Sequence, residues 1–192
     1  MFEPKNFESL LGTPGFSDIL LKNHFTLYQG YNTNTNKILE ELALLSQSQK
    51  TNTPEFAELK RRFGWEFNGL RLHELYFDNL KNGESNFSAN SALNQKIVAE
   101  FGDFSSWEKD FKTTGAMRGI GWVILYQDPV SDHLFNTWVN EHDTGHLAGA
   151  NPLLVMDVFE HAFMLDYGLK RADYIEAFFK AIDWETAEKR LD

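Results

Sequence analysis

The chain has 192 residues, a formal net charge of −10 and no cysteine. The lack of cysteine excludes disulfides, thiolate zinc sites, iron–sulfur clusters and a cysteine nucleophile, and it is compatible with the cytoplasm, where we expect the protein. The negative charge argues against nucleic acid or an anionic membrane as a partner. We also expect no secretory signal and no transmembrane helix, because no apolar run is long enough for either.

Two long helices are predicted in the first half of the chain. Apolar residues recur at helical spacing over residues 16–45, after a possible cap at Ser17, and again over residues 54–80. The polar break at residues 46–54 separates them. The two segments therefore predict an antiparallel helical hairpin.

A polar segment rich in Gly, Ser and Asn, residues 81–92, follows the hairpin. We expect a domain boundary here, with a helical hairpin domain at residues 1–84 and a C-terminal domain at residues 85–192. The predicted elements of the second domain are helices at 93–101 and 104–117, strands at 122–126, 133–139 and 152–159, and helical segments over 171–190. The expected fold class is α+β, a helical hairpin followed by an α/β half with a three-stranded antiparallel sheet.

The most informative motif is Asp157-Val158-Phe159-Glu160-His161, at the end of the apolar run 152–156. A carboxylate in such a run is costly to bury without a partner. His161, four residues on, can share that partner. One possibility is that Asp157 forms an ion pair with Arg171 or Lys170.

The other possibility is a metal ion. His24 and His73 lie on the apolar faces of the two predicted helices, and an antiparallel hairpin can bring them together. With Asp157 and His161 they supply four nitrogen and oxygen donors and no thiolate, a set that suits a first-row transition metal. Without a metal, these histidines would be buried structural residues.

The order of several motifs resembles that of the iron/manganese superoxide dismutases from about residue 16 to residue 190. The family's DxWEH signature is present with Phe159 in place of Trp. The other matching motifs are Gly119-Ile120-Gly121-Trp122, Leu72-His73-Glu74-Leu75-Tyr76-Phe77 and Asp183-Trp184.

The resemblance implies that His24, His73, Asp157 and His161 hold one Fe or Mn ion per subunit, with solvent as a fifth ligand. The ion would cycle between +3 and +2 and convert superoxide to dioxygen and hydrogen peroxide. The donor set does not separate Fe from Mn. A non-catalytic metal-binding or scaffold relative of the same fold is the alternative, and a hydrolytic zinc site fits poorly because no base is evident.

The family places a hydrogen-bonding side chain, often Gln, beside the metal-bound solvent. We assign this role to His142, in the segment before the third strand, and His146 stays open because the loop makes the count uncertain. In other members a Gln four residues before the second-helix ligand fills this role. Gly69 stands at that position here and leaves room for a group from the other side.

Tyr31 matches the family's gateway tyrosine, but it follows His24 by seven residues where eight are usual. Seven residues at about 100° each return within about 20° of the same helix face, so both side chains can reach the site without a π-bulge. The rival alignment places Asn23 at the ligand position instead.

The resemblance also implies a homodimer or a homotetramer, and an anion-guiding role for Arg171. One guanidinium near the opening can attract superoxide despite the overall negative charge. Glu160, which in the family pairs with a ligand histidine of the other subunit, is retained. Tyr28 and Met164 stand where the family often has an intersubunit His–Tyr bond, so we expect that bond to be absent or replaced by packing of Tyr28 on the Met164 sulfur.

Overall fold

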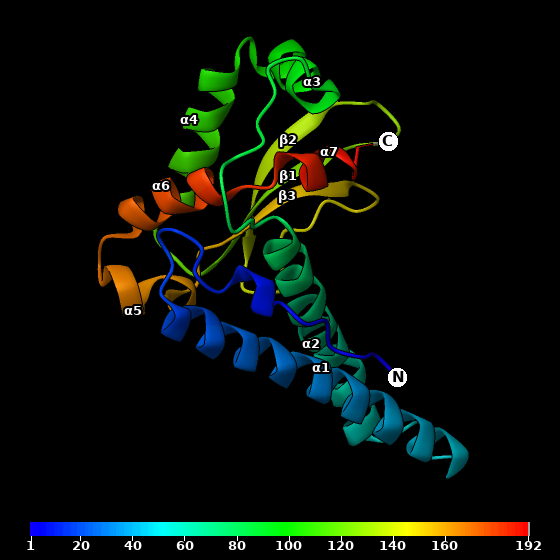
Figure 1. Ribbon diagram of the computed structural model, residues 1–192. Coiled ribbons are helices and arrows are strands. Elements are labelled where there is room, and N and C mark those ends of the chain that lie inside the picture. Colours follow the sequence, from blue (N-terminus) through cyan, green and yellow to red (C-terminus); the bar gives the residue numbers. More distant parts are fainter. Residues whose placement is uncertain (192) are drawn as a thin grey trace.

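The computed structural model describes residues 1–191 and has the expected α+β architecture. Helices α1 (Asp18–Gln47) and α2 (Pro54–Asp78) form the antiparallel hairpin, whose connecting end projects away from the sheet (Figure 1). Both helices begin where a side chain caps them: Ser17 and Thr53 each accept a hydrogen bond from the backbone N–H three residues on. The predicted hairpin is therefore confirmed.

The remaining elements follow the predicted order with small shifts. They are η1 (Glu8–Leu10), α3 (Ala92–Phe101), α4 (Phe104–Gly115), β1 (Gly121–Gln127), β2 (Leu134–Asn140), β3 (Asn151–Asp157), η2 (Glu160–Ala162), α5 (Met164–Tyr167), α6 (Arg171–Ala181) and α7 (Trp184–Glu188). The third strand ends at Asp157, earlier than expected, because the chain turns there into η2. The last helical segment is split at Ile182, which forms an isolated bridge with Leu80.

The three strands form one antiparallel sheet in the order β2-β1-β3. Every residue of the central strand β1 is buried, as expected for a strand covered on both faces. In the register, Trp122 of β1 lies opposite Asp157 at the end of β3. Strand pairing therefore places Asp157 beside Trp122, whose large side chain is buried.

The two halves share one hydrophobic core, which includes Leu20 and Leu70 from the hairpin and Val123 and Leu154 from the sheet. Asn79, which follows α2, donates from its amide to the Val155 carbonyl at 2.6 Å. The segment between α2 and α3 contains the predicted boundary at residues 84/85, which stays a prediction. No helix within residues 1–191 has the length and apolar character needed to cross a bilayer.

Candidate metal centre

His24 and His73 meet because the hairpin is antiparallel. His24 lies in the second turn of α1, and His73 lies near the C-terminal end of α2, so both residues lie at the same end of the antiparallel hairpin. Their ring centroids are 5.0 Å apart and both side chains are buried. Asn23 is exposed, so the alignment that places it at the ligand position is wrong.

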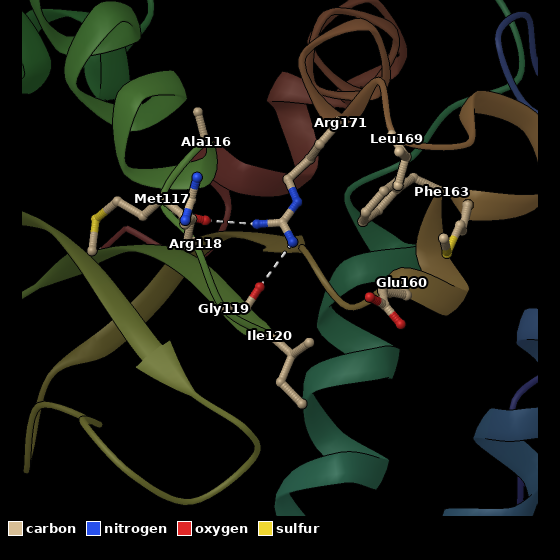
Figure 2. Close-up of a pocket in the computed structure, with 10 residues that line it drawn as sticks. Ala116, Met117, Arg118, Gly119, Ile120, Glu160, Phe163, Leu169 and Arg171 are labelled. Carbon is tan, nitrogen blue, oxygen red and sulfur yellow. Dashed lines mark hydrogen bonds between the residues drawn. The ribbon is translucent and has the colours of Figure 1, made fainter.

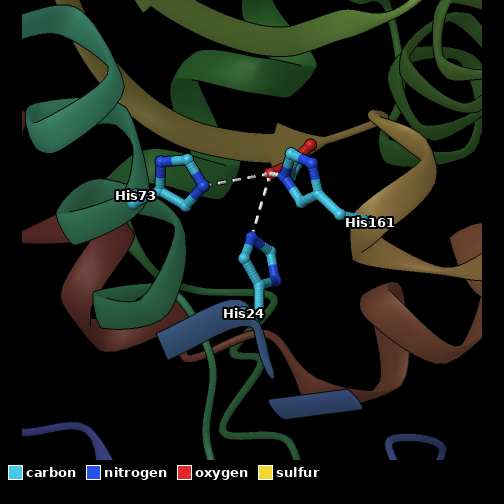
Figure 3. Close-up of side chains that lie close together, drawn as sticks. His24, His73 and His161 are labelled. Carbon is cyan, nitrogen blue, oxygen red and sulfur yellow. Dashed lines mark hydrogen bonds and ion pairs between the residues drawn. The ribbon is translucent and has the colours of Figure 1, made fainter. Parts of the chain in front are cut away.

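Asp157 and His161 complete the group from the end of β3 and from η2. Asp157 Oδ2 lies 3.2 Å from His24 Nε2, 3.1 Å from His161 Nε2 and 3.8 Å from His73 Nε2. One donor atom of each residue lies within 4.8 Å of all the others. Figure 3 shows the three imidazole rings turned toward one another. We call these four residues the His/Asp cluster.

The predicted alternative of an ion pair with Arg171 is wrong. Asp157 is completely buried among the histidines. The Arg171 guanidinium instead donates to the carbonyl oxygens of Met117 and Gly119, at 2.7 and 2.8 Å. Lys170 is exposed and precedes α6.

The protonation of His73 fits a bound cation. Its Nδ1 lies 2.6 Å from the Gly69 carbonyl, which can only accept, so the ring proton is on Nδ1. Nε2 then presents a lone pair to Asp157 Oδ2 and has no hydrogen-bond partner among residues 1–191. Two facing lone pairs in a buried site are unfavourable unless a cation lies between them.

The pKa shifts of the cluster also favour a bound cation. Burial is the largest influence on the pKa values of His24 and His73 and lowers both, so these rings are neutral at pH 7. Burial would raise the pKa of Asp157, but the charge of His161 and the hydrogen bonds from His161 and His24 hold it well below its usual range. Asp157 Oδ1 accepts the Phe159 N–H at 2.8 Å, so Oδ2 is left to face the histidines. His24 and His73 therefore offer neutral nitrogen atoms beside an ionised carboxylate, a combination that suits a metal ion.

Tyr31 also reaches the cluster. Helix α1 is α-helical throughout, without a π-turn, and the Tyr31 ring stacks on His73 with centroids 5.1 Å apart. It fills the space that Gly69 leaves, because a Cβ on Gly69 would lie 2.5 Å from Tyr31 Cδ1. The Tyr31 ring therefore occupies the space beside Gly69, which we expected to be left for a group from the sheet side.

His142 lies beside Tyr31 and is fully buried. Its Nδ1 accepts the Trp122 indole N–H at 3.1 Å, so in the neutral ring the proton is on Nε2, which lies 2.7 Å from Tyr31 Oη. Burial lowers the pKa of His142 to about 4, so the ring is neutral at pH 7. His142 therefore donates to the Tyr31 oxygen.

Comparison with known proteins identifies the family. The profile described as iron/manganese superoxide dismutases, C-terminal domain, matches residues 89–190. An iron superoxide dismutase of Aquifex pyrophilus is 34% identical, over 99% of this chain and 91% of its own length. A manganese superoxide dismutase of Haloferax volcanii is 32% identical, over 91% of this chain and 85% of its own. The chain belongs to the iron/manganese superoxide dismutase family.

An iron superoxide dismutase of Cupriavidus metallidurans is 33% identical, over 92% of this chain and 89% of its own length. Relatives named for iron and for manganese therefore match this dismutase about equally well. The protein is thus a metal-dependent superoxide dismutase that uses Fe or Mn. The match over nearly the whole chain favours the enzyme over the non-catalytic relative that the sequence left open.

His146 does not face the cluster of this dismutase. Its Nε2 lies 2.9 Å from the carbonyl oxygen of His142, and its Nδ1 lies 2.8 Å from Tyr126 Oη. Of the two histidines considered for the solvent position, the structure brings only His142 to Tyr31.

Two aromatic residues next to His142 were not anticipated as part of the site. Trp65 lies edge-on to His142 with centroids 4.9 Å apart, and Phe159 stacks on His142 at 4.8 Å and on His161 at 5.1 Å. The spacing of Trp65, Gly69 and His73, each four residues apart, was a signal that Trp65 shares their helix face.

Arg171 lies apart from the cluster, at the wall of a surface cavity of about 600 Å³ (Figure 2). Glu160 and Phe163 line the same cavity, and the guanidinium lies over the Phe163 ring, 5.2 Å from its centroid. Tyr28 is buried and donates to Glu74 Oε1 at 3.0 Å. Whether Tyr28 packs on Met164 of another subunit stays a prediction.

Proposed function

We propose that the His/Asp cluster holds the catalytic Fe or Mn ion, one per subunit, and that superoxide is converted there. The observation that carries the proposal is the convergence of four donor atoms within 4.8 Å around a buried anionic carboxylate. Small shifts from this spacing would let all four atoms bind one ion. When bound, the ion would supply the redox chemistry by alternating between +3 and +2.

Around the cluster, backbone groups fix the ligand orientations. The Gly69 carbonyl holds the proton of His73 on Nδ1, and the Phe159 N–H holds Asp157 Oδ1. The Tyr174 hydroxyl donates to the Asp157 carbonyl at 2.6 Å. Such partners set the direction and basicity of the ligands.

Tyr31 is proposed to hold a proton for the reaction. Because His142 donates to Tyr31 Oη, the phenol proton remains free to be donated toward the cluster. Burial raises the pKa of Tyr31 to about 12, and Asp157 and Glu66 add to this effect, so the phenol keeps its proton at pH 7. Formation of hydrogen peroxide consumes protons, and a held phenol beside the site is suited to take part in their delivery.

Arg171 is proposed to guide superoxide to the opening. Its two backbone hydrogen bonds satisfy the guanidinium without neutralising it, so the charge still acts on an approaching anion. Glu160 lines both this cavity and a neighbouring one of about 430 Å³ that borders His161. Met164 also lines both, so the cavity at Arg171 adjoins the one that borders His161.

The direct test combines elemental analysis with activity. The purified protein is stripped of metal, reloaded separately with Fe and Mn, and assayed for superoxide removal. The proposal predicts about one ion per subunit and activity with at least one metal, and loss of that ion in His24→Ala. Full metal retention in His24→Ala would reject the ligand assignment.

The proposal includes two further properties, the oligomeric state and the cellular location. A homodimer or homotetramer agrees with the exposed apolar residues Met164, Leu165 and Leu169, which line the two cavities next to Glu160. A fully active monomer in analytical ultracentrifugation would refute it. A cytoplasmic location agrees with the lack of cysteine, and cell fractionation would test it.

A further inference from the structure

His142 lies on a segment with little regular structure. Residues 141–150, between β2 and β3, contain no helix or strand and one isolated bridge residue, Thr144. Glu141 has a positive φ of 54° and Gly145 one of 106°. A buried ring on such a loop needs interactions outside the loop to hold it, because neither a helix nor a strand fixes its backbone.

The main chain of His142 is connected to strand β1 through a second residue of the loop, His146. Its carbonyl oxygen accepts a hydrogen bond from His146 Nε2 at 2.9 Å. Since a carbonyl can only accept, the proton of the neutral His146 ring is on Nε2, and Nδ1 accepts from Tyr126 Oη at 2.8 Å. Burial raises the pKa of Tyr126 to about 12, so its hydroxyl keeps the proton that it donates.

Both anchors of His142 start from strand β1. Trp122 and Tyr126 are four residues apart on β1, so their side chains leave the same face of the strand. Trp122 holds the His142 ring through Nδ1, and Tyr126 holds the His142 backbone through His146. One buried strand therefore fixes both the ring and the main chain of the same residue.

We propose that Tyr126 and His146 are positioning residues of this dismutase, which hold the backbone of His142 so that its Nε2–H stays aimed at Tyr31. The inference rests on the proposed function of His142. Both ring nitrogens of His146 are already used, by Tyr126 and by the His142 carbonyl, so His146 has no free atom to offer the metal site.

The test uses the metal-loaded full chain, three single variants and one double variant. Tyr126→Phe removes only the hydroxyl, His146→Ala removes both hydrogen bonds, and His146→Gln restores a side chain that can donate and accept. We expect Tyr126→Phe and His146→Ala each to lower kcat about tenfold, with unchanged metal content and KM, as is typical when an outer partner is lost. The double variant should be no slower than His146→Ala, because Tyr126 acts through His146.

Two readouts separate positioning from a general structural role. Hydrogen exchange of the amides in residues 141–150 should become faster in Tyr126→Phe and His146→Ala, without a matching change in the melting temperature. His146→Gln should recover most of both the rate and the protection. The matched controls are Tyr167→Phe and His133→Gln, whose polar atoms contact Gly15 and Glu100 and no residue of the loop, and both should behave as wild type.

A parallel His142→Ala variant distinguishes this inference from the proposed function. If His142→Ala is slow while Tyr126→Phe and His146→Ala show wild-type kcat and loop exchange, the anchoring inference alone is overturned. If His142→Ala itself has wild-type kcat, the proposed role of His142 is overturned, and the catalytic part of this inference with it.

Discussion

Gly69 controls where the Tyr31 ring can lie, and Gly69→Ala tests that control. The added Cβ would lie 2.5 Å from Tyr31 Cδ1 and 2.8 Å from Cε1. Ordinary carbon contacts are about 3.5–4.0 Å, so the ring must move by roughly 1 Å. The hydrogen bond between Tyr31 Oη and His142 Nε2, now 2.7 Å, would then exceed the usual limit.

The matched control is Gly64→Ala, on the same helix, where an added Cβ meets nothing within 4 Å. Replacing a helical Gly by Ala contributes about 1 kcal/mol of stability in either variant. Overpacking at Gly69 costs about 1–3 kcal/mol. Gly69→Ala should therefore be less stable than Gly64→Ala by about 1–3 kcal/mol, the difference that isolates the Tyr31 contact.

Urea unfolding, metal analysis and steady-state kinetics measure the two variants side by side. Gly69→Ala should keep its metal, because the hydrogen bond to His73 uses the Gly69 backbone carbonyl. Its kcat should fall by about tenfold, whereas Gly64→Ala should match the wild type. Equal stability of the two variants, together with wild-type kcat in Gly69→Ala, would refute the argument.

Three other predictions follow from the charges and the metal site. Arg171→Ala should lower kcat/KM and weaken its dependence on salt, and no change in either would reject steering by Arg171. In the metal-free protein, the unfolded chain binds more protons than the folded one between pH 6.5 and about 4, because burial lowers the folded-state pKa of His142 to about 4. The free energy of unfolding should therefore fall as the pH drops through this window, by about 3 kcal/mol from His142 alone. His24 and His73, whose pKa values are also lowered, should add to this fall. Chemical denaturation that gives the same free energy of unfolding across the window would contradict this. Chelation should lower the melting temperature, because an ion at about 100 times its Kd adds about 2.7 kcal/mol to the free energy of unfolding. An unchanged melting temperature would argue against a metal that binds only the folded state.

The helices were predictable because their signals are local. Apolar spacing, the cap at Ser17 and the polar break at residues 46–54 lie within a few residues of the structure they specify, and α1 and α2 begin and end close to the predicted positions. Asp157 and His161 were recognisable for the same reason, since their spacing and apolar setting are visible in one short segment.

The interactions that the sequence did not reveal depend on residues far apart in the chain. The order β2-β1-β3 requires pairing of strands separated by loops of different length. The occupant of the space at Gly69 depends on Tyr31 of another helix, and the position of His146 depends on Tyr126 of a strand. No local pattern encodes these contacts, because the partners lie on different elements and meet only after those elements have packed together.

The central claim is that three imidazoles and one carboxylate bind a single redox-active ion. Anomalous diffraction from crystals of the metal-loaded protein, recorded at the Fe and Mn absorption edges, tests it most directly. The account predicts one peak per subunit, about 2.0–2.2 Å from the Nε2 atoms of the three histidines and from Asp157 Oδ2. A peak elsewhere, or none among these four atoms in protein that carries stoichiometric metal, would contradict it.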